Sequence, residues 1–263
     1  MEVLESMILG AVQGLTEFLP VSSSGHLQLA KELLGVELEE NLTFDIALHA
    51  ATVLSTFVVL WSEIWRLIKG LFSRGMNEEK SYFLKLIISM IPIGFVGFML
   101  GDAIDAMLSS QYIMLIVGAM LLLTAALLSF AYYARPRQKD NISYRDAFVI
   151  GVGQAVAAMP GLSRSGTTIA TGLLLGNNKS AVATFSFLMV LAPIMGEALL
   201  EIVDEGFAIE GVGTMSLAAG FLTAFVVGCL ACKYMINIVK KGKLIWFALY
   251  CAVVGVVAIA SYF

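Results

Sequence analysis

Six segments of this chain are long and apolar enough to cross the hydrocarbon core of a membrane as helices. About 20 apolar residues in a helix span the roughly 30 Å of that core, and the predicted spans are 42–62, 82–101, 112–133, 180–203, 214–235 and 244–262. Hydrophobic residues make up 59% of the sequence, which is more apolar surface than a soluble core could hide. The sequence therefore predicts an all-α integral membrane protein that forms a single membrane domain over residues 1–263.

Two further regions, 3–35 and 146–176, are each interrupted near the middle by Pro, Gly and Ser residues, which leaves two short helical arms. This pattern is typical of a re-entrant helical hairpin, which leaves the membrane on the side from which it entered. Irregular backbone at membrane depth is tolerated only where protein or a wet cavity satisfies its amide groups. We therefore expect both interruptions to face an internal site.

The two hairpin regions are copies of one another, offset by 141 positions without a gap. The matched identities are Gly10 with Gly151, Gln13 with Gln154, Ser22 with Ser163, Ser24 with Ser165, Gly25 with Gly166, Leu33 with Leu174, Leu34 with Leu175 and Gly35 with Gly176. Three predicted spans separate the hairpins, so the hairpins would open on opposite faces of the membrane. The sequence thus predicts an inverted-topology repeat, with repeat one at about 1–134 and repeat two at about 142–263.

The basic residues predict how the chain is oriented. Alternating the six spans places fourteen of the sixteen Lys and Arg residues on one side, and the two exceptions are Lys31 and Arg164. Because basic loops stay in the cytoplasm, we expect a multi-pass protein of the plasma (inner) membrane whose first hairpin faces the exterior or periplasm. The second hairpin would open from the cytoplasm. No basic run suggests a nucleic-acid partner, and the sequence leaves room for a homodimer.

The first hairpin places an amide and an acid on one helical face. Gln13 and Glu17 are four residues apart, so their side chains point toward the same volume. An ionised carboxylate at membrane depth costs roughly 2.5–3.5 kcal/mol, which some partner should offset. One reading is a Glu17 that reaches interfacial water, or is protonated and bonded to Gln13. The other is a site for a divalent cation, Mg²⁺ or Ca²⁺, with both side chains as oxygen ligands.

A turn rich in serine follows directly, with the sequence Pro20-Val-Ser22-Ser23-Ser24-Gly-His26. Small hydroxyl residues that enter a helix present free backbone N–H groups, which suit a phosphate. Ser22 and Ser24 are therefore candidates for binding the substrate, although an ordinary serine N-cap would give the same pattern. His26 titrates near neutral pH, so it could activate a serine hydroxyl such as that of Ser23, or a water, or protonate a leaving oxygen.

The second hairpin supplies a cation among small polar residues. Its polar residues are Gln154, Ser163, Arg164, Ser165, Thr167 and Thr168. Arg164 is the only basic residue that the predicted topology places inside the protein, and its guanidinium offers paired N–H donors to phosphate oxygens. The alternative is a salt bridge from Arg164 to Glu197 or Glu201 that only ties helices together.

The remaining signals do not point to another enzyme class. The sequence contains no Gly-x4-Gly-Lys-Ser/Thr loop for ATP, no His-Glu-x-x-His zinc motif and no Gly-x-Ser-x-Gly elbow. His49 lies close to Asp45 on the first full span. Two interpretations of His49 stay open, helix packing and a supporting hydrogen bond.

The polar motifs resemble those of the undecaprenyl-pyrophosphate phosphatases, integral membrane enzymes linked to bacitracin resistance. The resemblance rests on Gln13-x-x-x-Glu17, on Pro20-Val-Ser-Ser-Ser-Gly-His26 and on Pro160-Gly-Leu-Ser-Arg-Ser-Gly166, and it covers essentially the whole chain. It implies hydrolysis of a C55 polyprenyl diphosphate lipid to the monophosphate and inorganic phosphate, which recycles the carrier for cell-wall polymer synthesis. It also implies a divalent cation and an active site on the exterior side.

The same resemblance implies roles for individual residues. Glu17 with Gln13 would serve the metal and the diphosphate, Ser23 would be the nucleophile and His26 the acid/base. The diphosphate would be clamped by Arg164 together with Ser163, Ser165 and Thr168. The resemblance leaves open whether Ser23 forms a covalent intermediate or water attacks directly. Many members have Glu at the position of Gln13, which leaves this chain one fewer formal charge for the cation.

A second class of function fits the same architecture. Inverted repeats with broken helices are usual in transporters, so the chain could flip polyprenyl phosphate or carry a small anion. A serine turn with a histidine and a carboxylate favours catalysis, because a carrier needs no nucleophile. A combined role, hydrolysis followed by return of the lipid, fits both classes.

Overall fold

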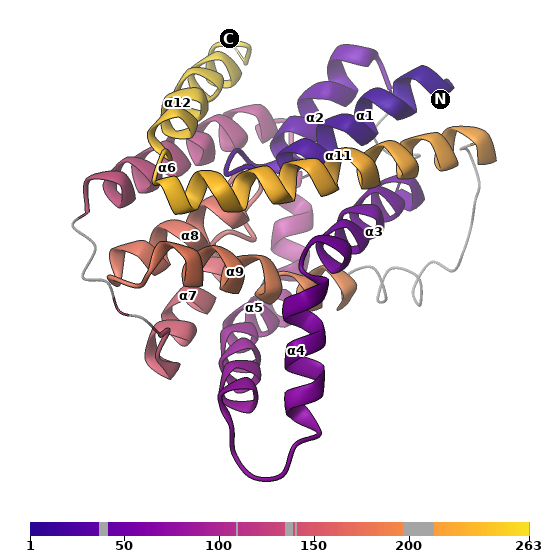
Figure 1. Ribbon diagram of the computed structural model, residues 1–263. Helices are drawn as coiled ribbons and strands as arrows, with labels where there is room; N and C mark the ends of the chain where they lie inside the picture. The colour runs from indigo at the N-terminus through magenta and orange to yellow at the C-terminus, as the bar shows by residue number, and fades with distance from the viewer. Residues whose placement is uncertain (37–41, 109, 135–138, 140, 197–212, 263) are drawn as a thin grey trace.

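The computed structural model describes residues 1–36, 42–108, 110–134, 139, 141–196 and 213–262, and Figure 1 shows the helices in one bundle from which α4 and the adjoining end of α5 project. The helices are α1 (Val3–Thr16), α2 (Ser23–Leu34), α3 (Leu42–Val59), α4 (Trp61–Leu71), α5 (Glu78–Leu108), α6 (Ile113–Tyr133), α7 (Tyr144–Val156), α8 (Arg164–Leu174), α9 (Lys179–Met189), α11 (Thr214–Lys241) and α12 (Ile245–Ala260). The residues described contain no strand. The prediction of an all-α protein is confirmed.

Several of these helices can cross a membrane. In the described part of the chain, four stretches are long and apolar enough: Glu78–Gly101, Ile113–Tyr133, Lys179–Gly196 and Thr214–Lys241. A fifth follows if α3 and α4 count as one bent span. The predicted span 244–262 corresponds to α12, whose 16 residues reach only about 24 Å. The chain is therefore a multi-pass membrane protein by the length and composition of its helices.

Two predicted spans are interrupted. The span 42–62 bends by 76° between α3 and α4, because the chain becomes amphipathic there and exposes charged residues such as Arg66. A helix with a charged face does not continue a path through hydrocarbon. Within the predicted span 180–203, a single turn residue, Val190, separates α9 from a further helical stretch, 191–196, with Pro193 in its first turn. Residues 197–203 lie outside the described residues. Proline fits that turn because its missing N–H would have no partner there.

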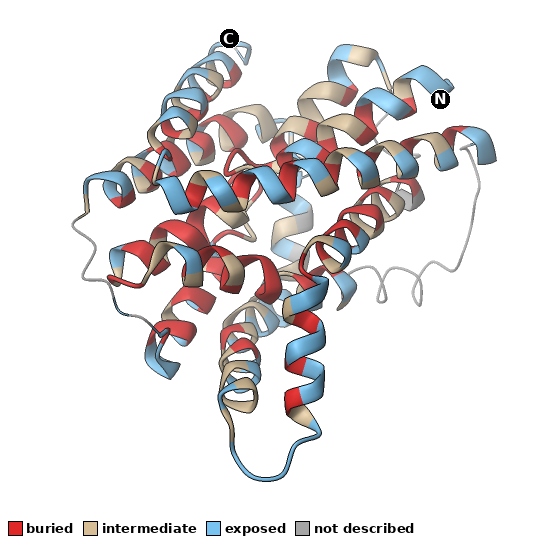
Figure 2. Cartoon of the chain, in the orientation of Figure 1, coloured by how far each residue is buried: buried red, intermediate tan, exposed pale blue. Residues whose placement is uncertain are grey.

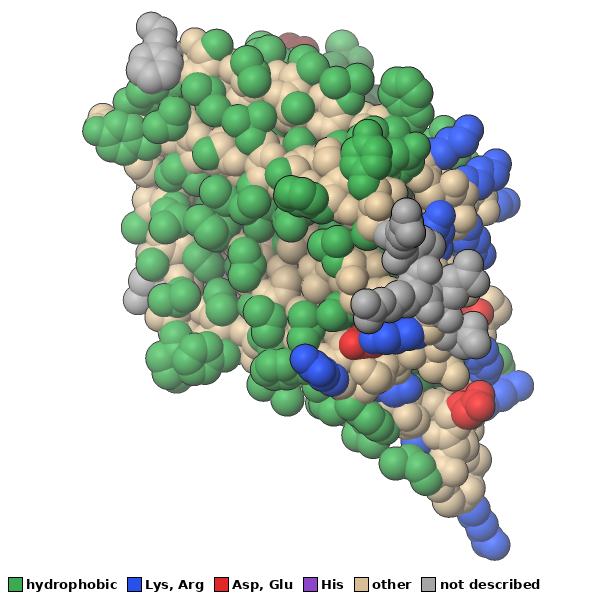
Figure 3. Space-filling model, turned by 90° about the vertical axis from the view of Figure 1, so that its left-hand side faces the viewer, with side chains coloured by type: hydrophobic (Ala, Val, Ile, Leu, Met, Phe, Trp, Pro, Cys, Tyr) green, Lys and Arg blue, Asp and Glu red, His purple; other side chains and the backbone are tan. Residues whose placement is uncertain are grey.

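The outside of the bundle is apolar over broad areas. Figure 3 shows hydrophobic side chains covering one face, with Lys and Arg gathered along one edge. Large side chains at the surface include Phe98, Leu230 and Trp246, which are 84%, 67% and 68% exposed. Figure 2 shows the buried residues concentrated in α8 and on the inner sides of the helices around it. Apolar surface on this scale indicates contact with lipid.

Two helix crossings depend on glycine. α1 packs on α11, where a Cβ on Gly10 would lie 2.4 Å from the carbonyl oxygen of Gly220. α7 packs on α5, where a Cβ on Gly151 would lie 2.3 Å from the carbonyl oxygen of Ser89. Gly10 and Gly151 are matched positions of the duplication. The first helix of each copy therefore approaches a long helix of the other copy in the same way.

We expect Gly151→Ala to destabilise the protein by about 1–3 kcal/mol, because the added methyl group meets backbone atoms that cannot move aside. The midpoint of thermal unfolding in detergent measures the loss. Gly97→Ala is the matched control, since a Cβ at Gly97 of α5 meets nothing within 4 Å. Equal midpoints for the two variants would contradict the close crossing of α7 and α5.

Candidate active site

The turn between α1 and α2 is held in an unusual backbone conformation. Of the described residues other than glycine, only Ser22 has a positive φ, at 71°. Such a conformation is costly for a side chain with a Cβ and is characteristic of functional sites. Ser22 is also the N-cap of α2, where its Oγ accepts a hydrogen bond from the N–H of Gly25 at 3.3 Å. Its Oγ lies 3.3 Å from that of Ser24.

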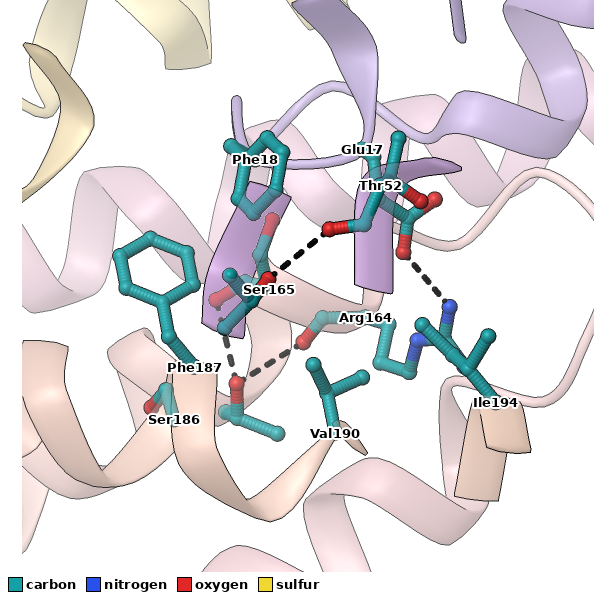
Figure 4. Close-up of a pocket in the computed structure, with 11 residues that line it drawn as sticks. Glu17, Phe18, Thr52, Arg164, Ser165, Ser186, Phe187, Val190 and Ile194 are labelled. Carbon is teal, nitrogen blue, oxygen red and sulfur yellow. Dashed lines mark hydrogen bonds and ion pairs between the residues drawn. The ribbon is translucent and has the colours of Figure 1, made fainter. Parts of the chain in front are cut away.

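Glu17 begins this turn, and its carboxylate is fully engaged. Ser23 Oγ donates to Oε2 at 2.7 Å, and Gln13 Nε2 donates to the same oxygen at 3.1 Å. Arg164 Nη2 donates to Oε1 at 2.8 Å, as Figure 4 shows. The side chains of Glu17 and Arg164 are only 6% and 24% exposed. A buried ion pair with further hydrogen bonds to its carboxylate thus joins the first hairpin region to the second.

The turn between α7 and α8, the second turn, has serines at the same positions as the turn between α1 and α2. It is followed by the cation Arg164, whereas the first turn begins with the acid Glu17. Ser163 is the N-cap of α8, where its Oγ accepts from the N–H of Gly166 at 3.1 Å. Ser163 Oγ lies 3.4 Å from Ser165 Oγ, which matches the Ser22 and Ser24 contact. Two helix N-termini, each with a serine cap, therefore accompany the ion pair.

The second turn is fixed to its surroundings on two sides. The N–H of Ser163 donates to Thr124 Oγ1 of α6 at 3.1 Å. Ser165 Oγ donates to the carbonyl oxygen of Leu19 in the first turn at 3.1 Å. Thr168 Oγ1 donates to the carbonyl oxygen of Arg164 at 3.0 Å. Because the two turns are bonded to each other, the position of Arg164 relative to Glu17 is set by backbone contacts as well as by charge.

A pocket opens beside the ion pair, and hydroxyl groups from three helices, α3, α8 and α9, line it. Apart from Glu17 and Arg164, its polar residues are Thr52, Thr56, Ser165, Thr168 and Ser186, and its apolar residues are Phe18, Phe187, Val190 and Ile194. Figure 4 shows Arg164 extending across the pocket toward Glu17. A guanidinium among hydroxyls suits a phosphoryl group. The pocket also has an apolar wall.

The sequence did not single out Thr52, Thr56 or Ser186. Thr52 and Thr56 lie four residues apart on α3, so they share one face of that helix. Two hydroxyl residues at this spacing inside an apolar span were the sequence signal from which Thr52 and Thr56 could have been found. Ser186 comes from α9, and its buried Oγ has no hydrogen-bond partner among the described residues. Nothing in the sequence near Ser186 distinguishes it from other small residues in that helix.

His26 faces a different partner from the one expected. Its Nδ1 lies 2.8 Å from the carbonyl oxygen of Ser22, and its Nε2 lies 2.7 Å from the hydroxyl of Tyr250 on α12. In the described part of the chain no hydrogen bond joins His26 to Glu17, Ser23 or Arg164. The residue predicted as acid/base therefore lies in the first turn of α2, close to Ser23 in sequence, but its ring contacts α12.

The remaining predicted residues take varied positions. Gln154 is fully buried, neither of its amide atoms has a hydrogen-bond partner among the described residues, and it is not among the residues that line the pocket. His49 Nδ1 contacts the carbonyl oxygen of Asp45 at 2.9 Å within α3. The Asp45 carboxylate instead pairs with buried Lys31 at 2.5 Å. Glu197 and Glu201, the alternative partners of Arg164, lie outside the described residues.

The donor set around Glu17 fits a divalent cation. Gln13 Oε1 is a buried oxygen with no hydrogen-bond partner among the described residues. It belongs to the same amide that donates to Glu17 Oε2. An amide oxygen beside a carboxylate is a hard donor pair of the kind that Mg²⁺ and Ca²⁺ prefer. The searched part of the chain has no cluster of three or more His, Cys, Asp or Glu residues, so substrate oxygens or waters would have to complete the coordination.

Comparison with known proteins gives one consistent result. A family model described as "Bacitracin resistance protein BacA" matches residues 6–257. A protein of Bacteroides fragilis named undecaprenyl-diphosphatase is 62% identical over 262 residues, which is 98% of each chain. Proteins with the same name from Parabacteroides distasonis and Methanosphaera stadtmanae are 60% identical over 263 residues and 38% over 279, and these alignments cover at least 98% of each chain.

Proposed function

This chain belongs to the family of the bacitracin resistance protein BacA, and we infer from that membership and from its site that it is an undecaprenyl-diphosphatase. The reaction is hydrolysis of undecaprenyl diphosphate to undecaprenyl phosphate and inorganic phosphate, which recycles the lipid carrier for cell-wall polymers. Relatives with this name match nearly the whole chain at up to 62% identity. The observation that supports the reaction most directly is the contact of Arg164, Glu17 and Ser23 where two serine-capped helices begin.

The arrangement suits phosphoryl transfer, in which positioning and neutralisation of charge supply most of the catalysis. Arg164 now bonds Glu17, and its planar guanidinium can bond phosphate oxygens in the same way. We propose that the terminal phosphate of the substrate replaces Glu17 as the partner of Arg164. The backbone N–H groups at the starts of α2 and α8 can donate hydrogen bonds to further phosphate oxygens.

Release of Glu17 from Arg164 would free a carboxylate that already touches Ser23. The attacking oxygen, whether it is Ser23 Oγ or a water in its place, must lose a proton as it bonds to phosphorus. Glu17 is the acceptor that lies in contact with Ser23, whereas His26 has no bond to that hydroxyl. We therefore assign proton acceptance from the nucleophile to Glu17. His26 is left to protonate or steer another oxygen of the substrate.

We further propose that a divalent cation, Mg²⁺ or Ca²⁺, binds with the diphosphate. Gln13 Oε1, which has no bonded partner among the described residues, and the Glu17 carboxylate would hold it. The cation would neutralise charge on the diphosphate oxygens. In this chain the amide of Gln13 contributes no charge to that site.

The side of the membrane is also a proposal. Lys and Arg gather along one edge of the apolar face in Figure 3, as a cytoplasmic edge would require. We propose that the protein lies in the plasma membrane, that the two hairpin regions insert from opposite sides, and that the diphosphate enters from the exterior. Cysteine labelling near Asp102 and near Arg137 in intact cells tests this orientation.

The test of the function is phosphate release from undecaprenyl diphosphate by the purified protein in detergent. We expect release with Mg²⁺ or Ca²⁺ and at least a hundredfold less with excess chelator, because the cation offsets charge at the reacting phosphate. Restoring the cation should restore the rate. A well-folded protein that binds polyprenyl phosphate but releases no phosphate would contradict the phosphatase and favour a transporter.

A further inference from the structure

The ring of His26 is held between its own helix and the last helix of the chain. Its Nδ1 lies 2.8 Å from the carbonyl oxygen of Ser22. Its Nε2 lies 2.7 Å from the hydroxyl of Tyr250, and the two rings stack with centroids 5.5 Å apart at an angle of 18°. Tyr250 is 224 residues away in sequence. Both nitrogens of His26 are thus occupied, one by backbone and one by α12.

These contacts decide which nitrogen of neutral His26 carries the proton. A carbonyl oxygen can only accept a hydrogen bond, so Nδ1 must be the donor toward Ser22. Nε2 then holds the free electron pair and accepts from the hydroxyl of Tyr250. The basic nitrogen of His26 is therefore Nε2, and its direction is fixed by a phenol.

Next to Tyr250, α12 contacts the turn between α1 and α2, so the position of the phenol is fixed relative to that turn. Cys251 Sγ lies 3.4 Å from the carbonyl oxygen of Pro20 and contacts it as a donor. Cys251 and Val21 belong to one buried apolar cluster, and α12 packs along α6. Tyr250 itself is 44% exposed. Tyr250 is therefore held in place by a buried neighbour although the residue itself is partly exposed.

We propose that Tyr250 is a positioning residue for His26 in the hydrolysis of the diphosphate. Tyr250 holds the imidazole so that Nε2 is the basic nitrogen and points along the α12 side of the turn. A substrate that lies over the first turn of α2 then meets Ser23 and the Glu17–Arg164 pair on one side and, on the other, the imidazole of His26 with the Tyr250 hydroxyl bonded to its Nε2. Ser23 and His26 are three residues apart and share one face of α2. This inference rests on the proposed phosphatase function and adds α12 to its site.

Tyr250→Phe tests the hydroxyl alone, because the variant keeps the ring and its stacking on His26 and removes only the hydrogen bond to Nε2. We expect kcat for phosphate release to fall about tenfold, a fraction of what a histidine acid/base contributes, with KM within about twofold. Tyr234→Phe is the matched control, since Tyr234 is 64% exposed on α11. It should leave both constants unchanged. An unchanged kcat in Tyr250→Phe, with active wild-type protein, overturns the proposal and leaves the phosphatase intact.

Imidazole ¹⁵N spectra test the contact without activity. The chain has two histidines, His26 and His49, so His49→Gln assigns both sets of signals. We expect Tyr250→Phe to move the Nε2 signal of His26 and to leave those of His49 in place. An unmoved Nε2 signal overturns the proposal. Wild-type protein without hydrolysis overturns the phosphatase and this inference together.

A double variant separates positioning from a merely structural role of Tyr250. If Tyr250 acts through His26, Tyr250→Phe should cause no further loss of kcat in a His26→Gln background. The same tenfold loss in both backgrounds would show that the hydroxyl only supports α12, which contradicts the proposal.

Discussion

Replacing Arg164 by Met should lower kcat/KM for phosphate release at least a thousandfold, within the range that an arginine contributes to phosphoryl transfer. Arg164 is the cation that lies against Glu17 and the pocket hydroxyls, so its loss leaves the phosphate without its bidentate donor. Arg164→Lys should lose about a hundredfold, because an ammonium keeps the charge but not the planar pair of donors. Arg66→Met is the control, since exposed Arg66 on α4 pairs with its neighbour Glu63 and such surface pairs contribute little.

Measurement of lipid binding and of turnover tests whether Arg164 clamps the phosphate with two N–H donors or supplies only a positive charge. If it clamps the phosphate, the Met variant should lose affinity for the diphosphate as well as turnover. Full turnover by Arg164→Lys would show that charge alone suffices and would contradict the bidentate clamp. Unchanged turnover in Arg164→Met would contradict the site itself.

Glu17→Gln should lower turnover about a thousandfold, because an amide cannot take the proton of the attacking oxygen. In the Glu17→Gln variant the Arg164 side chain loses its ion pair, but because it is 24% exposed it can turn into the pocket. Arg164→Met instead leaves the Glu17 carboxylate buried without its cation, which should cost about 3–5 kcal/mol of stability. The double variant Glu17→Gln with Arg164→Met should regain most of that stability and none of the activity.

Thermal unfolding in detergent and phosphate release, measured on all three variants, test this expectation. Glu63→Gln on α4 serves as the control for loss of an exposed carboxylate. A double variant as unstable as Arg164→Met alone would mean that the unpaired carboxylate is not the source of the destabilisation.

The overall class of the fold follows from the sequence because it depends on local properties. Long apolar stretches predict helices that cross a membrane, and α5, α6 and α11 lie where three predicted spans were placed. The two interrupted regions also form the expected helix, turn and helix. A polar turn inside an apolar bundle needs polar neighbours. The hydrogen bonds between Glu17 and Arg164, and between Ser165 and Leu19, meet that need.

The features that the sequence did not predict depend on contacts between distant segments. Tyr250 sits in a helix that is otherwise apolar, and its register against α2 follows from how α12 packs on α6 and on Pro20. Likewise, the direction in which α2 leaves the turn, and with it the position of His26, depends on the backbone of Ser22, whose positive φ no propensity predicts for serine. The orientation of a side chain around such a turn is a property of the folded bundle.

The crossing of α1 on α11 constrains the order in which the protein can be made. A ribosome synthesises α1 first and α11 nearly last, so the glycine face at Gly10 has no partner until most of the chain has emerged. Glu17 likewise waits for residue 164 before its charge is paired. A nascent chain would have to place an unpaired carboxylate in lipid, which is unfavourable. The first hairpin region therefore reaches its final depth only after the second half of the chain has been inserted.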